Sequence, residues 1–264
     1  MSEKIKVGIY YRDTNPQEEL EKKLIKLFPQ YGMVFDNENP DVVIHIGGDG
    51  TFLRAVHHYL NRIEKTKFLG IKAGTLGYFY EFNDDHLEKI LKMVQDQDYK
   101  TDEYPLLKGD IAFKNEKKTI YAINEMRIES PFRTLICDVS INGELLEKFR
   151  GNGLNVSTSI GSTAYNKSLK GAIVEPHLPL IQLCEIAPIS NNIYRSLGSP
   201  MVLNGKDVVT FNSDFSSVLL GYDFQDIDVK DALKIDITLS NRKVVIIRGA
   251  DYSYIQTIRR SFIK

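Results

Sequence analysis

The feature that most constrains this chain is a short apolar run that leads into three glycines, Asp41-Val-Val-Ile-His-Ile-Gly-Gly-Asp-Gly-Thr51. The apolar residues predict a strand covered on both faces, as in a parallel sheet. The glycines allow a sharp turn and a close approach of the backbone to a ligand. Helical spacing begins at Thr51, so the turn opens into a helix N-terminus, which attracts anions. We therefore predict a phosphate-binding turn formed by Gly47, Gly48, Gly50 and Thr51.

One carboxylate, Asp49, lies inside this turn. An acid is out of place in a site that only binds phosphate. Phosphoryl transfer, however, needs a group that holds a metal or takes a proton from the attacking hydroxyl. The alternative interpretation is a tight structural loop with Asp49 as the helix N-cap. The turn is neither a P-loop nor the dinucleotide fingerprint, because its residues and glycine spacing differ from both.

Residues 1–101 alternate between predicted strands and predicted helices, which indicates an α/β domain with a parallel sheet. The expected strands are Ile5–Tyr11, Val42–Ile46 and Phe68–Ile71. In such sheets ligands bind at the carboxyl ends of the strands. The glycine turn and the loop Gly74–Gly77 both follow strands, so we expect them to line the same crevice.

Residues 102–249 show short strand-like runs separated by turn signals, which predicts an all-β domain resembling a sandwich. Asn142-Gly143 and Asn204-Gly205 are each flanked by such runs and predict two hairpins. Ser240–Arg242 is a third expected turn, between the runs Ile235–Leu239 and Lys243–Ile247. Residues 250–264 have helical spacing and are expected to pack back on the first domain.

The stretch Phe149–Ser168 is rich in hydroxyls, amides and glycines, and it fits neither a regular strand nor an ordinary surface loop. Its residues 157–163 could donate to ribose or phosphate oxygens, and Tyr165 could stack on a base. Asn124-Glu125 is a polar pair in a strand-like run, at a position expected to be buried. Each feature alone is also consistent with a plain loop or a strand end.

The composition narrows the class of partner. A net charge of −1 gives no basic field for nucleic acid, and no apolar run is long enough to span a bilayer, so neither a nucleic-acid nor a membrane partner is expected. Cys137 and Cys184 are interpreted as buried reduced thiols of a cytoplasmic protein. His45, inside the apolar run, is interpreted as a core histidine with its hydrogen bonds satisfied.

Five motifs, taken together and in order, resemble those of the bacterial NAD kinases. They are Gly47-Gly-Asp-Gly-Thr51, Gly74-Thr-Leu-Gly77, Asn124-Glu125, Arg150-Gly-Asn-Gly153 and Gly161-Ser-Thr-Ala-Tyr-Asn-Lys-Ser168. The first is shared with diacylglycerol, sphingosine and 6-phosphofructo-kinases, whereas the last is more specific. The resemblance implies an α/β domain followed by a β-sandwich domain, and a homodimer or homotetramer. It also implies ATP or polyphosphate as donor and a divalent metal such as Mg²⁺, with no ligand set for the metal indicated.

Carried over by resemblance, Asp49 is the base that takes a proton from the adenosine ribose 2′-hydroxyl of NAD. That hydroxyl attacks the terminal phosphate of ATP and gives NADP. The resemblance implies a set of NAD-binding residues besides Asp49. They are Gly50, Tyr78, Phe79, Asn124, Glu125, Arg150, Asn152, Ile160, Thr163, Ala164, Tyr165, Asn166, Lys167, Ser168, Ala187 and Gln225.

Three positions depart from the family pattern. Asn152 stands where an aspartate is usual, Ile160 replaces a hydroxyl residue, and Phe224 replaces a common glycine in Tyr222-Asp-Phe-Gln225. All three concern dinucleotide binding. They bear on affinity rather than on the proposed base.

Two alternative functions are compatible with the residues. One is a kinase of a lipid or sugar hydroxyl, against which the absence of a basic apolar surface helix and the presence of the Ser-Thr-Ala-Tyr block both argue. The other is an NAD(P)-binding sensor without turnover. The altered Asn152 and Ile160 favour the sensor, whereas the intact Asp49 argues against it.

Overall fold

The computed structural model describes residues 4–12, 15–72 and 77–263. The chain divides into two compact units, Met1–Glu103 with Val244–Lys264, and Tyr104–Lys243. Two long strands, β6 (Lys100–Phe113) and β17 (Ala232–Arg248), run through these boundaries. The boundaries predicted from the sequence lie at residues 101 and 249.

The first unit contains the predicted parallel sheet. Its strands are β1 (Ile5–Tyr11), β2 (Met33–Phe35), β3 (Val42–Gly47), β4 (Lys67–Lys72), β5 (Phe82–Asn83) and the end of β17. They follow the order β17-β4-β3-β1-β2, with β5 beside β4, and every pair is parallel. The three strands expected from the sequence are confirmed, with ends that differ by a residue at most.

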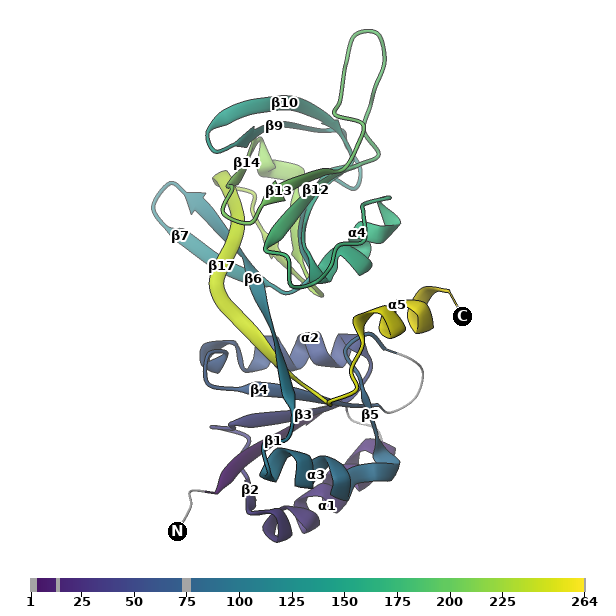
Figure 1. The fold of residues 1–264 in the computed structure, drawn as a ribbon. Coiled ribbons are helices and arrows are strands. Elements are labelled where there is room, and N and C mark those ends of the chain that lie inside the picture. Colours follow the sequence, from purple (N-terminus) through teal and green to yellow (C-terminus); the bar gives the residue numbers. More distant parts are fainter. Residues whose placement is uncertain (1–3, 13–14, 73–76, 264) are drawn as a thin grey trace. The chain divides into compact units, whose positions relative to one another are not determined.

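Helices cover both faces of this sheet (Figure 1). They are α1 (Asn15–Leu27), α2 (Asp49–His58) and α3 (Leu87–Gln95), with short 3₁₀ turns at Phe28–Tyr31, Leu60–Arg62 and Asp84–His86. Leu24 of α1 and Leu91 of α3 share one buried core with the strands. Phe52 of α2 instead contacts His45, whose side chain points to the opposite face.

The last helix, α5 (Tyr254–Phe262), belongs to the same unit. The Tyr254 ring lies 6.4 Å from that of Tyr78, and Arg260 donates to the Tyr80 carbonyl at 3.4 Å. The C-terminal segment therefore contacts the stretch that follows β4.

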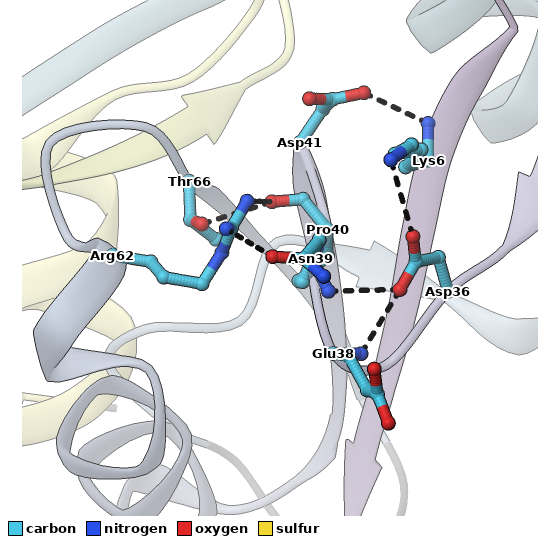
Figure 2. A network of polar contacts seen from close by, with 8 residues as sticks. All are labelled: Lys6, Asp36, Glu38, Asn39, Pro40, Asp41, Arg62 and Thr66. Carbon is cyan, nitrogen blue, oxygen red and sulfur yellow. Dashed lines mark hydrogen bonds and ion pairs between the residues drawn. The ribbon is translucent and has the colours of Figure 1, made fainter.

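A polar network fixes the connection from β2 to β3 (Figure 2). The Asp36 carboxylate accepts from the backbone amides of Glu38 (3.0 Å) and Asn39 (2.8 Å). The same group pairs with Lys6, and Arg62 and Thr66 bond to Asn39 and Pro40. These bonds settle the amino end of β3, and the glycine turn lies at its carboxyl end.

The second unit is built from two antiparallel sheets. One has the order β10-β9-β14-β17, with β6 beside β17 and β7 beside β6, and the other has the order β13-β12-β11-β8-β15-β16. The first sheet contains β7 (Lys117–Ala122), β9 (Leu135–Ile141), β10 (Glu144–Gly151) and β14 (Val209–Ser213). The second contains β8 (Glu125–Glu129), β11 (Gly153–Thr158), β12 (Leu180–Ile186), β13 (Met201–Asn204), β15 (Leu219–Tyr222) and β16 (Gln225–Asp228). A single apolar core lines both, as predicted for a sandwich.

Of the two predicted hairpins, only the first is confirmed. Asn142 and Gly143 join β9 to β10 with φ of 53° and 86°, the left-handed backbone that a two-residue turn requires. Asn204-Gly205 joins strands of different sheets, because β13 pairs with β12 whereas β14 pairs with β9 and β17. Gly205 is needed for close packing instead, since an added Cβ would lie 2.7 Å from the Pro179 carbonyl oxygen.

The prediction of a turn at Ser240–Arg242 is also wrong. β17 runs without interruption from Ala232 to Arg248. It pairs with β14 near its start and with β4 near its end, so tertiary pairing outweighs the local turn preference of these polar residues.

Within the described residues, no helix combines the length and apolarity required to cross a membrane.

Candidate functional site

The glycine turn of the first unit connects β3 to α2. Gly48 is the N-cap of α2, and its carbonyl accepts from the Thr51 amide at 2.7 Å. Gly47 has a φ of 149°, and an added Cβ there would lie 2.5 Å from Thr51 Oγ1. Around Gly48 and Gly50, in contrast, no atom of the described residues lies within 4 Å of an added Cβ. Gly47 is therefore required by the fold, whereas Gly48 and Gly50 leave open space at the helix N-terminus.

Asp49 is the first residue of α2, and its carboxylate is held by another segment. Its two oxygens accept from the backbone amides of Tyr78 and Phe79, each at 3.0 Å. The alternative interpretation of Asp49 as the N-cap is wrong, because Gly48 occupies that position. Burial raises the pKa of Asp49 and outweighs the lowering effect of the two amides. A carboxylate with a raised pKa is a better proton acceptor than an ordinary surface aspartate.

The segment Tyr78–Glu81 is itself fixed by ring packing and hydrogen bonds. The Phe79 ring stacks on Phe52 of α2 at 4.1 Å, and the Tyr80 hydroxyl donates to the Gly48 carbonyl at 2.5 Å. An added Cβ at Gly77 would lie 2.9 Å from Asp49 Oδ1. Residues 73–76 of the predicted Gly74–Gly77 loop lie outside the described residues.

His45 is a core residue, as predicted, but its hydrogen bonds are not satisfied. Its ring lies 5.0 Å from that of Phe52 and 4.9 Å from that of Tyr80. Neither ring nitrogen has a hydrogen-bond partner among the described residues. Burial, with a smaller effect of Arg248, lowers the pKa of His45 to about 3, so the ring is neutral and acts as an aromatic support.

In the second unit, the stretch around residues 149–168 is more regular than expected. Residues Gly153–Thr158 form β11, a fully buried strand between β8 and β12. A 3₁₀ turn (Ile160–Thr163) and the short helix α4 (Tyr165–Ser168) follow. The prediction that this stretch avoids a regular strand is therefore wrong for its first half, because pairing of β11 with β8 and β12 outweighs the polar composition.

Several of these hydroxyls already have protein partners. Thr158 Oγ1 donates to the Ile123 carbonyl at 2.7 Å and accepts from the Gly161 amide at 2.9 Å. Ser159 Oγ donates to the Leu178 carbonyl, and Ser162 Oγ accepts from the Val174 amide. These hydroxyls bond within the protein and hold the loop together. Fewer hydroxyl groups are therefore free to bind a ligand than the number of serines and threonines in the loop indicates.

Asn124 and Glu125 lie at the start of β8 and are 8% and 5% exposed. Their backbone is locked to the loop, because the Thr158 amide donates to the Asn124 carbonyl at 2.9 Å. Glu125 Oε2 has no hydrogen-bond partner in the described part of the chain. Burial, helped by the charge of Asp223 and opposed by Arg127, raises the pKa of Glu125 to about 8. This raised pKa favours the protonated form of Glu125 near neutral pH, and in that form its carboxyl group can donate a hydrogen bond.

The other predicted NAD-binding residues of this unit differ in exposure. Asn152, Lys167, Ser168 and Ala187 are exposed, Arg150, Thr163, Ala164, Tyr165 and Gln225 are half-buried, and Ile160 and Asn166 are buried. The Asn166 side-chain amide accepts from the Cys184 thiol and donates to the Ser162 carbonyl, so it also stabilises the loop. The Tyr165 ring packs 5.2 Å from the Arg127 guanidinium.

Two residues that contact these positions were not singled out from the sequence. Tyr194 stacks on the Arg150 guanidinium at 4.3 Å, in an irregular segment without a periodic signal. Asp223 bonds to the backbone of residues 123 and 124. Asp223 belongs to the Tyr222-Asp-Phe-Gln225 motif, in which the family resemblance indicates Gln225 as the NAD-binding residue.

The described residues contain no group of three or more His, Cys, Asp or Glu side chains that could hold a metal ion. A cation bound by phosphates needs only one or two protein carboxylates, as is usual for Mg²⁺.

Known proteins of one family match this chain over nearly its whole length. Residues 12–99 match the family model of the ATP-NAD kinase N-terminal domain, and residues 123–249 match that of the ATP-NAD kinase C-terminal domain. An NAD kinase of Lactococcus lactis subsp. cremoris is 34% identical over 264 residues, which is 98% of this chain and 97% of that protein. NAD kinase 1 of Bacillus anthracis is 37% identical over 236 residues, 88% of this chain and 89% of that protein.

Two solved structures share the fold. Yeast NADH kinase complexed with NADH superposes with a TM-score of 0.85 at 21% identity, covering 98% of this chain and 87% of that chain. An NAD kinase from Archaeoglobus fulgidus in complex with ATP gives a TM-score of 0.77 at 21% identity, covering 97% and 99%.

Proposed function

This chain belongs to the NAD kinase family, and we propose that Asp49 is the general base of its phosphotransferase activity. The activity is transfer of the terminal phosphate of ATP to the adenosine ribose 2′-hydroxyl of NAD. The observation that carries the proposed role of Asp49 is its position. A half-buried carboxylate of raised pKa lies within the glycine turn and is held at both oxygens by amides.

In the proposed step, Asp49 takes the proton of the 2′-hydroxyl while the hydroxyl oxygen bonds to the terminal phosphorus. The bond from that phosphorus to its bridging oxygen breaks, and ADP leaves with the electron pair. The two amides keep the carboxylate in one orientation, which reduces the reorganisation needed at the moment of proton transfer. General-base assistance of this kind contributes about 10²–10⁴ in rate.

The open sides of Gly48 and Gly50 support a phosphate-binding role for the turn, because a phosphate can approach the backbone where no side chain intervenes. A divalent cation such as Mg²⁺ would be bound by the phosphates of ATP, and it would neutralise charge on the transferred group.

For the second unit, we propose that Asn124, Glu125 and the partly or fully exposed loop residues Thr163, Ala164, Tyr165, Lys167 and Ser168 bind the dinucleotide. Glu125 supports this role through its burial and its unpaired Oε2. Arg150, Asn152, Ala187 and Gln225 remain candidates for further contacts, whereas the buried positions of Ile160 and Asn166 favour structural roles.

We further propose that the protein is a cytoplasmic homodimer or homotetramer. Two buried free thiols, Cys137 and Cys184, suit a reducing compartment. Exposed apolar side chains in residues 189–197, among them Ile193 at 82% exposure, suit a subunit interface. Light scattering on the purified chain measures the assembly directly.

The test of the function is NADP formation with ATP, Mg²⁺ and NAD. Asp49→Asn keeps the size of the side chain but removes its basicity, so we expect kcat to fall roughly 10³-fold with NAD binding retained. Asp84→Asn, at an exposed carboxylate of the same unit, is the matched control and should leave kcat unchanged. A folded wild-type chain that binds NAD but forms no NADP would instead indicate the sensor function.

A further inference from the structure

The turn between β15 and β16 directs a carboxylate into the buried end of β8. Asp223 is the first residue of this two-residue turn, with a φ of 51°. Asp223 Oδ1 accepts from the Asn124 amide at 2.8 Å, and Oδ2 accepts from the Ile123 amide at 2.9 Å. The Asp223 amide in turn donates to the Glu125 carbonyl at 3.1 Å. One residue thus bonds to the backbone of three consecutive positions.

This arrangement is more than a turn motif, because it buries a charge. Asp223 is only 8% exposed, and a buried carboxylate is costly unless donors surround it. The donors to Asp223 are the backbone amides of Ile123 and Asn124, the two residues before Glu125 in the sequence. The charge therefore lies beside a second, buried carboxyl group whose Oε2 has no partner among the described residues.

We infer that Asp223 is a positioning residue for NAD binding, because its hydrogen bonds fix the backbone that carries Asn124 and Glu125 and so hold these two residues for contact with the dinucleotide. This inference rests on the proposed role of Asn124 and Glu125 in binding NAD. It adds Asp223 as a functional residue of the Tyr222-Asp-Phe-Gln225 motif.

The electrostatic surroundings of Glu125 agree with this assignment. Asp223 faces it from the β15–β16 turn, Arg127 from its own strand, and the Tyr165 backbone from α4. Burial and the Asp223 charge raise the pKa of Glu125, and Arg127 and the Tyr165 hydrogen bond lower it, with a net value of about 8. The donating form is therefore present at neutral pH and is lost as the pH rises through about 8.

The pH dependence has a definite sign. The KM for NAD should be constant while Glu125 is protonated, and it should rise as the pH passes about 8 and Glu125 ionises. Replacing Asp223 by asparagine removes the repulsion that disfavours ionised Glu125. Its pKa then falls, and the rise in KM begins at a lower pH.

The experiment compares the wild type with Asp223→Asn and with Asp226→Asn, an exposed carboxylate of the same hairpin. Steady-state kinetics are measured over a pH range that brackets the Glu125 pKa, with NAD and ATP varied separately. For Asp223→Asn we expect the KM for NAD to rise roughly tenfold, since charged hydrogen bonds to buried amides are lost. The KM for ATP should be unchanged, and the inflection of the NAD profile should move to lower pH. Asp226→Asn should match the wild type.

An unchanged KM for NAD and an unchanged inflection in a folded Asp223→Asn variant would overturn the inference while leaving the kinase function intact. Absence of NADP formation by the wild type would instead contradict the proposed function. If the Asp223→Asn variant does not fold, the pH profile of the KM for NAD is measured with Glu125→Gln instead. This variant donates at all pH values, so the inflection should disappear, and its persistence would overturn the inference.

Discussion

Glycine occurs in a polar stretch both at the glycine turn, residues 47–51, and at the loop of residues 157–168, yet it has opposite roles in the two places. Among the described residues, no atom lies within 4 Å of a Cβ added at Gly48 or Gly50, so their lack of a side chain is not required for packing against those residues. Gly161 faces the protein, where an added Cβ would lie 2.0 Å from the Asn124 carbonyl oxygen. Composition alone cannot separate the two uses, because both require the same absent side chain.

The polar residues of the two regions differ in the same way. Asp49 is supported by amides from a distant segment and retains a basic carboxylate. The hydroxyls of Thr158, Ser159 and Ser162 bond within their own unit and complete its structure. The first region thus holds a carboxylate in one orientation, whereas the second fixes the backbone near Asn124 and Glu125.

The largest expected effect is that of Gly161→Ala on stability. The new methyl group would collide with backbone rather than with a flexible side chain, so the loop has to shift. We expect a loss of about 3 kcal/mol in the free energy of unfolding, measured by urea titration with the wild type as reference. A midpoint equal to that of the wild type would contradict the packing role of this glycine.

Gly77→Ala should have an intermediate effect, on activity more than on stability. Its Cβ would lie 2.9 Å from Asp49 Oδ1 and 2.7 Å from the Tyr80 ring, so the carboxylate must leave its amides. Misplacement of a reacting group by about 1 Å costs on the order of 10²-fold in rate. Kinetics with saturating ATP and NAD should show the loss in kcat. A kcat equal to that of the wild type would show that the hydrogen bonds from the Tyr78 and Phe79 amides to Asp49 are dispensable.

Gly48→Ala should have the smallest effect on stability and so sharpens the comparison. Its φ of −109° is accessible to alanine, and open space surrounds the position, so the free energy of unfolding should stay within about 0.5 kcal/mol of the wild type. The KM for ATP should nevertheless rise, because the methyl group occupies the space proposed for phosphate. If neither quantity changes, the turn does not bind phosphate at this position.

Much of the fold could be predicted because its signals are local. The strand Val42–Gly47 follows from its apolar run, and the 142–143 turn from Asn-Gly. Asn204-Gly205 carries the same turn signal but connects two sheets, since the strands beside it find better partners elsewhere. Ser240–Arg242 continues a strand for the same reason. Local strand preference spans only about 1 kcal/mol among residue types, and strand pairing with burial overrides it.

The sequence by itself determined the α/β and all-β architectures, the glycine turn and the family, because periodicity and motif spacing depend on neighbours along the chain. Which groups surround Asp49 and Glu125 depends instead on contacts between distant parts of the chain. The partners of Asp49 lie 29 and 30 residues away, and Asp223 bonds to an amide 100 residues away. Such contacts depend on which strands and loops become adjacent when the whole core is buried, and no local pattern encodes that.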